Sequence, residues 1–114
     1  MSATPTRAFD HAVVELRDVP AERLADTAAL SALVVAAAGA VGIPPHAPPI
    51  VKHTTGSLAV GLLCREGHIV LHTSPQEGLC LVDVVARAPA RAAQGVDVIT
   101  RRLAPSGGRA MPGA

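Results

Sequence analysis

The stretch that decides the fold reads Arg65-Glu66-Gly67-His68-Ile69-Val70-Leu71-His72-Thr73-Ser74-Pro75, and Gly78 and Val82-Asp83-Val84 follow it. Glu66-Gly67 separates two apolar runs, and glycine tolerates the positive φ that tight turns often need. Residues 57–65, 68–73 and 79–86 are rich in aliphatic and β-branched side chains, which favour strands. These runs predict three consecutive antiparallel strands joined by short turns.

A further strand and two helices are predicted around this meander. Residues 9–16 mix valine and leucine with polar residues, as a half-buried strand does. A capping residue at Asp18, a proline and an Ala-rich apolar face predict one helix that ends at Gly42. The proline-rich residues 43–49 cannot continue it, because proline lacks an amide donor. From Ala90 onward, apolar residues at spacings of four and three predict a closing helix.

These elements predict an α+β fold, in which a single antiparallel sheet has two helices packed on one face. A chain of 114 residues has room for one domain. We therefore expect a flexible N-terminus at residues 1–8, a single domain at residues 9–104 and a flexible tail at residues 105–114.

Composition argues against several classes of partner. Aromatic residues make up 1% of the chain and the net charge is +1. Proteins that bind single-stranded nucleic acid, by contrast, usually rely on aromatic side chains for base stacking and on clustered cations. The longest apolar run, residues 28–41, is shorter than the roughly 20 residues that cross a bilayer. Residues 1–7 show no secretion signal. We expect a cytoplasmic protein without nucleic-acid or membrane partners, in which Cys64 and Cys80 are buried thiols.

The central stretch resembles the signature of the bacterial S-adenosylmethionine decarboxylase family. There, Glu-Ser-His-Ile runs into Ile-His-Thr-Trp-Pro-Glu, and a glycine, Asp-Val-Phe and Thr-Cys-Gly follow. The spacing from Glu66 through His72 to Asp83 matches, and the order of elements extends the resemblance over most of residues 9–103. The resemblance implies that family's fold, a homodimer and a small-molecule ligand of nucleoside-like type. The apolar, aromatic-poor composition also favours a homodimer.

The residue that makes the family's cofactor is missing. In the family a serine hydroxyl attacks the preceding carbonyl, the resulting ester eliminates, and the new chain start becomes a pyruvoyl group. Gly67 stands at this lost processing site, and glycine has neither the oxygen nor the β-carbon for these steps. We expect an uncut chain with no cofactor. Lys52, the only lysine, is a poor Schiff-base candidate because no phosphate-binding glycine loop accompanies it.

Most other positions of the decarboxylase machinery have changed. An alignment without gaps puts the family's catalytic cysteine, upstream serine, motif tryptophan, following glutamate and adenine-stacking phenylalanine on Arg87, Ala59, Ser74, Gln76 and His53.

The retained His72 is the main catalytic candidate. Histidine ordinarily exchanges a proton near neutral pH, so we assign His72, with Glu66, to acid/base roles. Strand alternation puts His68 on the same face as His72, and we assign His68, His53 and Ser74 to ligand binding. The alternative is that these are inherited structural histidines. We expect no metal, because two histidines fall short of the three ligands of a catalytic zinc site.

Three functions follow from these residues. The first is a repurposed pyruvoyl-independent enzyme, of lyase or isomerase type, that performs cyclisation, isomerisation or elimination in the ancestral pocket. The second is a non-catalytic subunit that binds a ligand or regulates an active homologue. The third, a polyamine-pathway decarboxylase, is opposed by Gly67.

Overall fold

The computed structural model describes residues 7–104 and 109–112. In chain order the elements are β1 (Phe9–Arg17), α1 (Ala21–Ala25), α2 (Thr27–Val41), β2 (Ile50–Thr54), β3 (Ser57–Cys64), β4 (Gly67–Ser74), the 3₁₀ turn η1 (Pro75–Glu77), β5 (Leu79–Arg87), α3 (Ala92–Leu103) and β6 (Arg109–Pro112).

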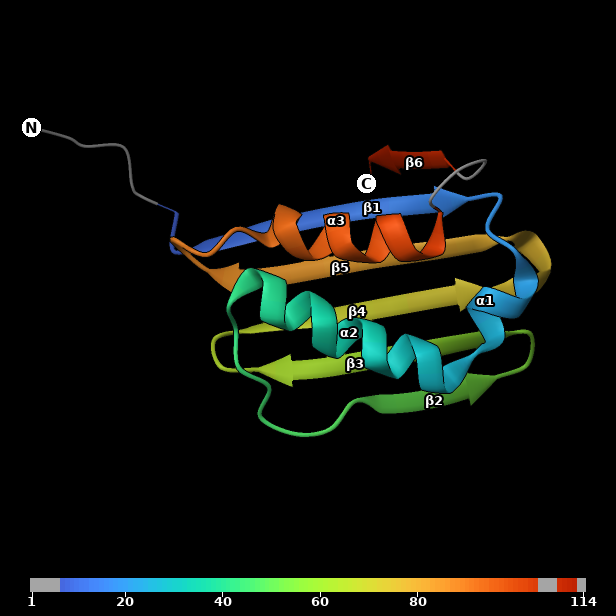
Figure 1. Ribbon diagram of the computed structural model, residues 1–114, viewed down its shortest axis with the longest axis horizontal. Coiled ribbons are helices and arrows are strands. Elements are labelled where there is room, and N and C mark those ends of the chain that lie inside the picture. Colours follow the sequence, from blue (N-terminus) through green and yellow to red (C-terminus); the bar gives the residue numbers. More distant parts are fainter. Residues whose placement is uncertain (1–6, 105–108, 113–114) are drawn as a thin grey trace, which may run out of the picture.

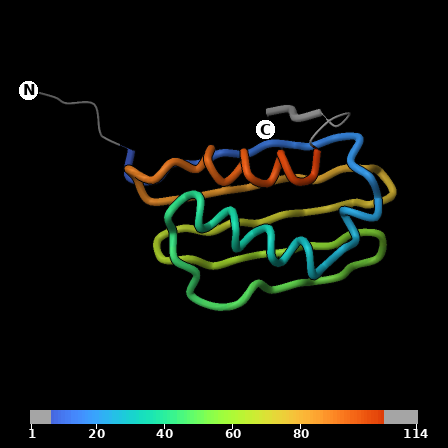
Figure 2. The backbone as a smooth tube through the Cα atoms, in the orientation of Figure 1, coloured from blue at the N-terminus to red at the C-terminus, as the bar shows by residue number. Residues whose placement is uncertain are grey.

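The strands form one six-stranded sheet in the order β2-β3-β4-β5-β1-β6, and every neighbouring pair is antiparallel. Helices α2 and α3 lie side by side over one face of this sheet (Figure 1). The path of the backbone in Figure 2 shows the predicted meander from β3 to β5. The predicted α+β fold with two helices on one face is confirmed. None of the described helices is long and apolar enough to cross a membrane.

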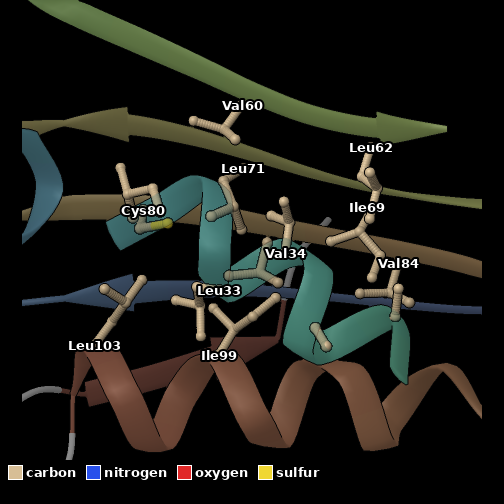
Figure 3. Packing of buried hydrophobic residues seen from close by; sticks show 14 of the residues in the cluster. Leu33, Val34, Val60, Leu62, Ile69, Leu71, Cys80, Val84, Ile99 and Leu103 are labelled. Atoms are coloured by element: carbon tan, nitrogen blue, oxygen red, sulfur yellow. The ribbon is translucent and has the colours of Figure 1, made fainter. Parts of the chain in front are cut away.

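The core lies between the two helices and the sheet face that they cover. Figure 3 shows it: aliphatic side chains of α2 and α3 meet those of β3, β4 and β5, among them Leu33, Val34, Ile99, Val60, Ile69, Leu71 and Val84. Alternation along each strand produces this layer, since every second residue of β4 and β5 is buried. Truncating a fully buried leucine such as Leu71 to alanine would cost about 2–5 kcal/mol of stability.

The single helix predicted from Asp18 is instead two helices. Pro20 precedes α1, and α2 begins anew at Asp26, whose Oδ1 accepts a hydrogen bond from the Ala29 amide at 3.1 Å. Such a side chain satisfies an amide that the first turn of a helix leaves free, so it favours a new helix start. The predicted end is confirmed, because Gly42 is left-handed with φ +88° and its amide donates to the Ala38 carbonyl.

Two edge strands were not predicted. Residues 50–54 pair with β3, and residues 109–112, assigned to a flexible tail, pair with β1. The structure thus places residues 109–112 of the predicted tail in an edge strand. An edge strand presents unpaired amides and carbonyls that a further segment can satisfy, whatever its hydrophobic pattern. Residues 1–6, 105–108 and 113–114 lie outside the described residues. Of the predicted N-terminal segment 1–8, the carbonyl of Ala8 accepts a 2.8 Å hydrogen bond from the Ala88 amide.

Candidate functional site

The predicted site residues of β4 lie on the face of the sheet that the helices leave uncovered. Along this strand the side chains of Ile69 and Leu71 are buried, whereas His72 is exposed and His68 is half-buried. His68 and His72 therefore share the open face, as alternation predicts. In Figure 1 this face is turned away from the viewer, behind α2 and α3.

His72 lies at the centre of a row of side chains that runs across five strands. The strand registers pair Lys52 with Ala59, Ala59 with His72, His72 with Leu81, and Leu81 with Glu15. Neighbouring strands are about 4.8 Å apart, so Lys52 and Glu15 each lie two spacings, about 10 Å, from His72 between Cα atoms. The row brings a cation, an imidazole and a carboxylate onto one surface.

This row is the floor of a hollow of about 460 Å³, which we call the His72 hollow. The next row along the sheet completes it with the hydroxyls of Thr54, Ser57 and Ser74 and the side chain of Leu79. The volume falls within the range of about 300–1,000 Å³ found for small-molecule sites. Of the predicted site residues, His72 and Ser74 lie here.

Some polar groups of the hollow are already paired and others are not. Arg17 donates a hydrogen bond to Glu15 Oε2, and the hydroxyls of Thr54 and Ser57 bond to each other. Within the described part of the chain, the side chains of His72 and Lys52 form no hydrogen bond or ion pair. Both are therefore available to a ligand.

The other predicted residues lie elsewhere. Glu66 occupies the β3–β4 turn with φ +55°, and its carbonyl accepts a 3.0 Å hydrogen bond from the Arg87 amide. Six residues of extended chain separate it from His72, which is about 20 Å. His68 is about 13 Å from His72 by the same measure. The structure does not bring Glu66 or His68 to His72.

His53 contributes to a neighbouring hollow. It pairs with the buried Leu58 and so lies on the helix-covered side of the edge strand β2, where a hollow of about 330 Å³ also contacts Pro75 and Gln76. That hollow shares Thr54, Ser57 and Leu58 with the His72 hollow, but His53 is not among the residues lining the latter.

Gly67, at the lost processing site, has its missing side chain directed at the helix-covered face. A Cβ there would lie 2.4 Å from the Val85 carbonyl oxygen and 3.2 Å from Ile43 Cδ1. Gly67 and His72 are five residues apart on one strand, which puts them on opposite faces and about 16 Å apart. Within one chain, therefore, His72 cannot act on a group carried by residue 67.

Sequence reasoning missed Glu15 and Thr54, and it weighed Lys52 only as a Schiff-base donor. No local signal identifies them, because the β1–β5 pairing that places Glu15 in the row joins segments far apart in sequence. The motif residue Asp83 is paired within the described part of the chain. Its partner is His11, whose Nε2 lies 2.6 Å from Asp83 Oδ1, while Arg87 lies over the Phe9 ring.

The remaining candidate features are structural. Cys64 and Cys80 are free, buried thiols, as predicted; burial raises the pKa of both, and that of Cys80 reaches about 12. In residues 7–104 and 109–112, no three His, Cys, Asp or Glu side chains are grouped so as to hold a metal ion. A hollow of about 510 Å³ beside α2 contains none of the predicted site residues, and Arg23 at its rim donates to the Leu103 carbonyl.

Comparisons with known proteins agree with the fold and the motif. The family model described as S-adenosylmethionine decarboxylase matches residues 10–111. The crystal structure of the adenosylmethionine decarboxylase from Aquifex aeolicus VF5 is similar, with a TM-score of 0.77 and 22% identity over 91% of this chain and 87% of that one. No curated protein matches the chain. On the match over nearly its whole length, the chain belongs to the S-adenosylmethionine decarboxylase family.

Proposed function

We propose that this chain is a pyruvoyl-independent small-molecule enzyme that uses His72 as a general acid or base. The observation that carries this proposal is the exposed imidazole at the centre of the His72 hollow, between Lys52 and Glu15. A hydrogen-bonded structural histidine would have a partner, as His11 has in Asp83. His72 has none in the described part of the chain.

The family's pyruvoyl group does not fit this chain. Gly67 has no hydroxyl to start the acyl shift, and the space for a side chain is already taken by the β5 backbone. The hollow and residue 67 also lie on opposite faces of β4. We therefore assign the chemistry of the hollow to its own side chains.

Proton transfer is the step that these side chains can supply. A positioned imidazole takes a proton from one ligand atom and returns it to another, which covers isomerisation, elimination and ring closure without a net change of oxidation state. Half-buried Ala59, Leu79 and Leu81 give the hollow an apolar floor. A ligand that covers this floor would exclude water from it, and charged and polar contacts are stronger where water is excluded.

The open face also supports a homodimer. Phe9, Ile50 and Leu63, exposed by 42%, 52% and 61%, lie on it beside half-buried Val70 and Val85; we call these five residues the apolar patch. Ile50, Leu63 and Val70 line one shallow apolar hollow, and an apolar surface of this kind often marks a protein–protein contact. A second copy packed on the apolar patch would wall the His72 hollow along one side.

The same patch favours a second candidate, a regulatory subunit that pairs with an active homologue. The two candidates differ in what they require of His72. An enzyme needs its proton transfer, whereas a regulatory partner needs only the surface around it.

The test is proton exchange catalysed by the purified chain. Mixtures of small metabolites in D₂O are followed by ¹H NMR, where abstraction and return of a proton appear as deuterium incorporation even without net conversion. His72→Ala should lower the rate about 10²- to 10⁴-fold, the usual contribution of a positioned acid or base. His72→Gln should not restore the rate, because a side-chain amide neither takes up nor releases a proton near neutral pH.

His46→Ala, a change in the exposed connector before β2, is the matched control and should leave the rate unchanged. Thermal melting checks that each variant folds. If His72→Gln catalyses proton exchange as fast as the wild type, His72 binds the ligand and does not transfer the proton. If no metabolite exchanges and the chain instead raises the activity of a serine-containing homologue, the regulatory candidate replaces the enzyme.

A further inference from the structure

Lys52 is a cation without a counter-charge in the His72 hollow. It is the only lysine of the chain, and its exposed side chain forms no ion pair with any described residue. The three hydroxyls of the hollow, those of Thr54, Ser57 and Ser74, lie in the row next to it at the same end. Donors therefore gather at the β2–β4 end of the hollow.

The opposite end has a different character. Glu15 is already neutralised by Arg17, and the aliphatic side chains of Ala59, Leu79 and Leu81 surround His72 between the two ends. From one end to the other, the hollow offers an ammonium with hydroxyls, an apolar middle and a paired carboxylate.

The hollow offers no phenylalanine, tyrosine or tryptophan ring on which a nucleobase could stack. The chain has one phenylalanine and neither tryptophan nor tyrosine, and Phe9 lies at the other end of β1, opposite Arg87. Stacking on aromatic rings is the usual way in which proteins hold a base. Among the described residues, His72 is the only ring that lines the hollow, and His53 lines the neighbouring one.

We propose that the His72 hollow binds a small aliphatic monocarboxylate, whose carboxylate is held by Lys52 and whose carbon chain crosses Ala59 toward His72. This inference rests on the proposed function for the site and adds the class of ligand. Two strand spacings, about 10 Å between the Cα atoms of Lys52 and His72, leave room for a chain of a few carbons. The carbon at the far end of that chain then comes within reach of the imidazole.

Charge favours one carboxylate over a phosphate or a dicarboxylate. Phosphate sites commonly use forked arginines or several backbone amides at a helix start, and neither lines the β2–β4 end of the hollow. A second carboxylate on the ligand would find no free cation among the described residues at the far end, because Arg17 is already paired with Glu15. A single ammonium with hydroxyls matches a single carboxylate.

The experiment uses 4-methylpentanoate as the probe and 4-methylpentanamide as its uncharged counterpart. Binding to the ¹⁵N-labelled full chain is followed by amide shifts, which should be largest at His72, Ser74 and Ala59. The carboxylate should bind at least about tenfold more tightly than the amide, the scale of one charge-assisted hydrogen bond. Equal binding of the two, or shifts that avoid the hollow, would overturn the proposal.

Variants assign the contact to Lys52. Lys52→Met should weaken carboxylate binding by about tenfold or more and leave amide binding unchanged, and Lys52→Arg should keep affinity within a few-fold. Arg101→Met removes an equal charge at an exposed position of α3. It is the matched control and should bind the carboxylate as the wild type does. Carboxylate binding that survives Lys52→Met would refute the role of Lys52.

Two further measurements separate this inference from the proposed function. His72→Ala should still bind 4-methylpentanoate within a few-fold; if it does and no proton exchange is ever found, the ligand class stands while the enzyme proposal falls. Adenosine is the competing probe. Adenosine that binds in the hollow independently of Lys52, and displaces the carboxylate, would return the site to a nucleoside-like ligand.

Discussion

Restoring the serine at residue 67 is the sharpest test of how this chain has departed from its family. Gly67→Ser supplies the missing hydroxyl, so chemistry alone would allow the chain to cut itself before residue 67. The structure makes a different prediction. The new Cβ would lie 2.4 Å from the Val85 carbonyl oxygen, and Cβ atoms essentially never come within 3.0 Å of another heavy atom.

The magnitude follows from what has to move. Val85 O belongs to the β5 backbone, so β4 and β5 must separate by about 0.6 Å or more where Gly67 pairs with Ala86. Overpacking of this kind costs about 1–3 kcal/mol, and a weakened ladder hydrogen bond adds about 1 kcal/mol. A loss of about 2–4 kcal/mol corresponds to a fall in Tm of roughly 8–16 °C for a chain of this size.

The assay combines intact mass spectrometry with thermal melting. We expect Gly67→Ser to remain one uncut chain with a lowered Tm. The matched control is Gly61→Ser in β3, where a Cβ meets nothing within 4 Å and φ is not positive, so its stability should change by less than about 1 kcal/mol. Two fragments divided between Glu66 and Ser at residue 67, or equal melting of the two variants, would refute the packing argument.

Three further outcomes are expected. The wild-type chain should show one mass close to the 11.5 kDa of its sequence, and two fragments would contradict the loss of processing. Light scattering at tens of micromolar should show a homodimer that Leu63→Glu breaks and that Val35→Glu, at an exposed residue of α2, leaves intact. A monomeric wild type would count against the apolar patch as an interface. Because burial raises the pKa of Cys80 from 9.0 to about 12, native Cys80 should resist thiol reagents at pH 8. The stability that the buried, protonated Cys80 thiol contributes is fully present below pH 9. It is lost as pH rises from 9 toward 12, because the thiol ionises more readily in the unfolded chain, so Cys80→Ala should flatten the alkaline fall in Tm.

The outline of the fold follows from local sequence signals. Runs of aliphatic and β-branched residues in 57–65, 68–73 and 79–86, separated by short turn segments, predict the meander. Gly42 marks the end of α2, since a left-handed residue ends the helix there. The loss of processing chemistry is likewise readable at Gly67 from residue type alone.

Other features depended on contacts between distant segments. The break between α1 and α2 at Asp26 was not predicted. The apolar run after Asp26 favours a helix whether that helix starts at Asp26 or continues through it. The edge strands β2 and β6 have little hydrophobic pattern of their own, and they form because β3 and β1 offer backbone groups to pair with. Glu66 seemed a partner for His72 by sequence, but extended chain carries it about 20 Å away.

The sequence by itself determined which side chains alternate, where the helices end and that residue 67 has no nucleophile, because these depend on single residues and their close neighbours. Only the tertiary structure decided which polar residues meet. His72 lies in line with Lys52 and Glu15 because four antiparallel registers align five strands. A slip of one residue in any of them would turn its strand's side chains to the other face, and those registers are set by the packing of the whole sheet against α2 and α3.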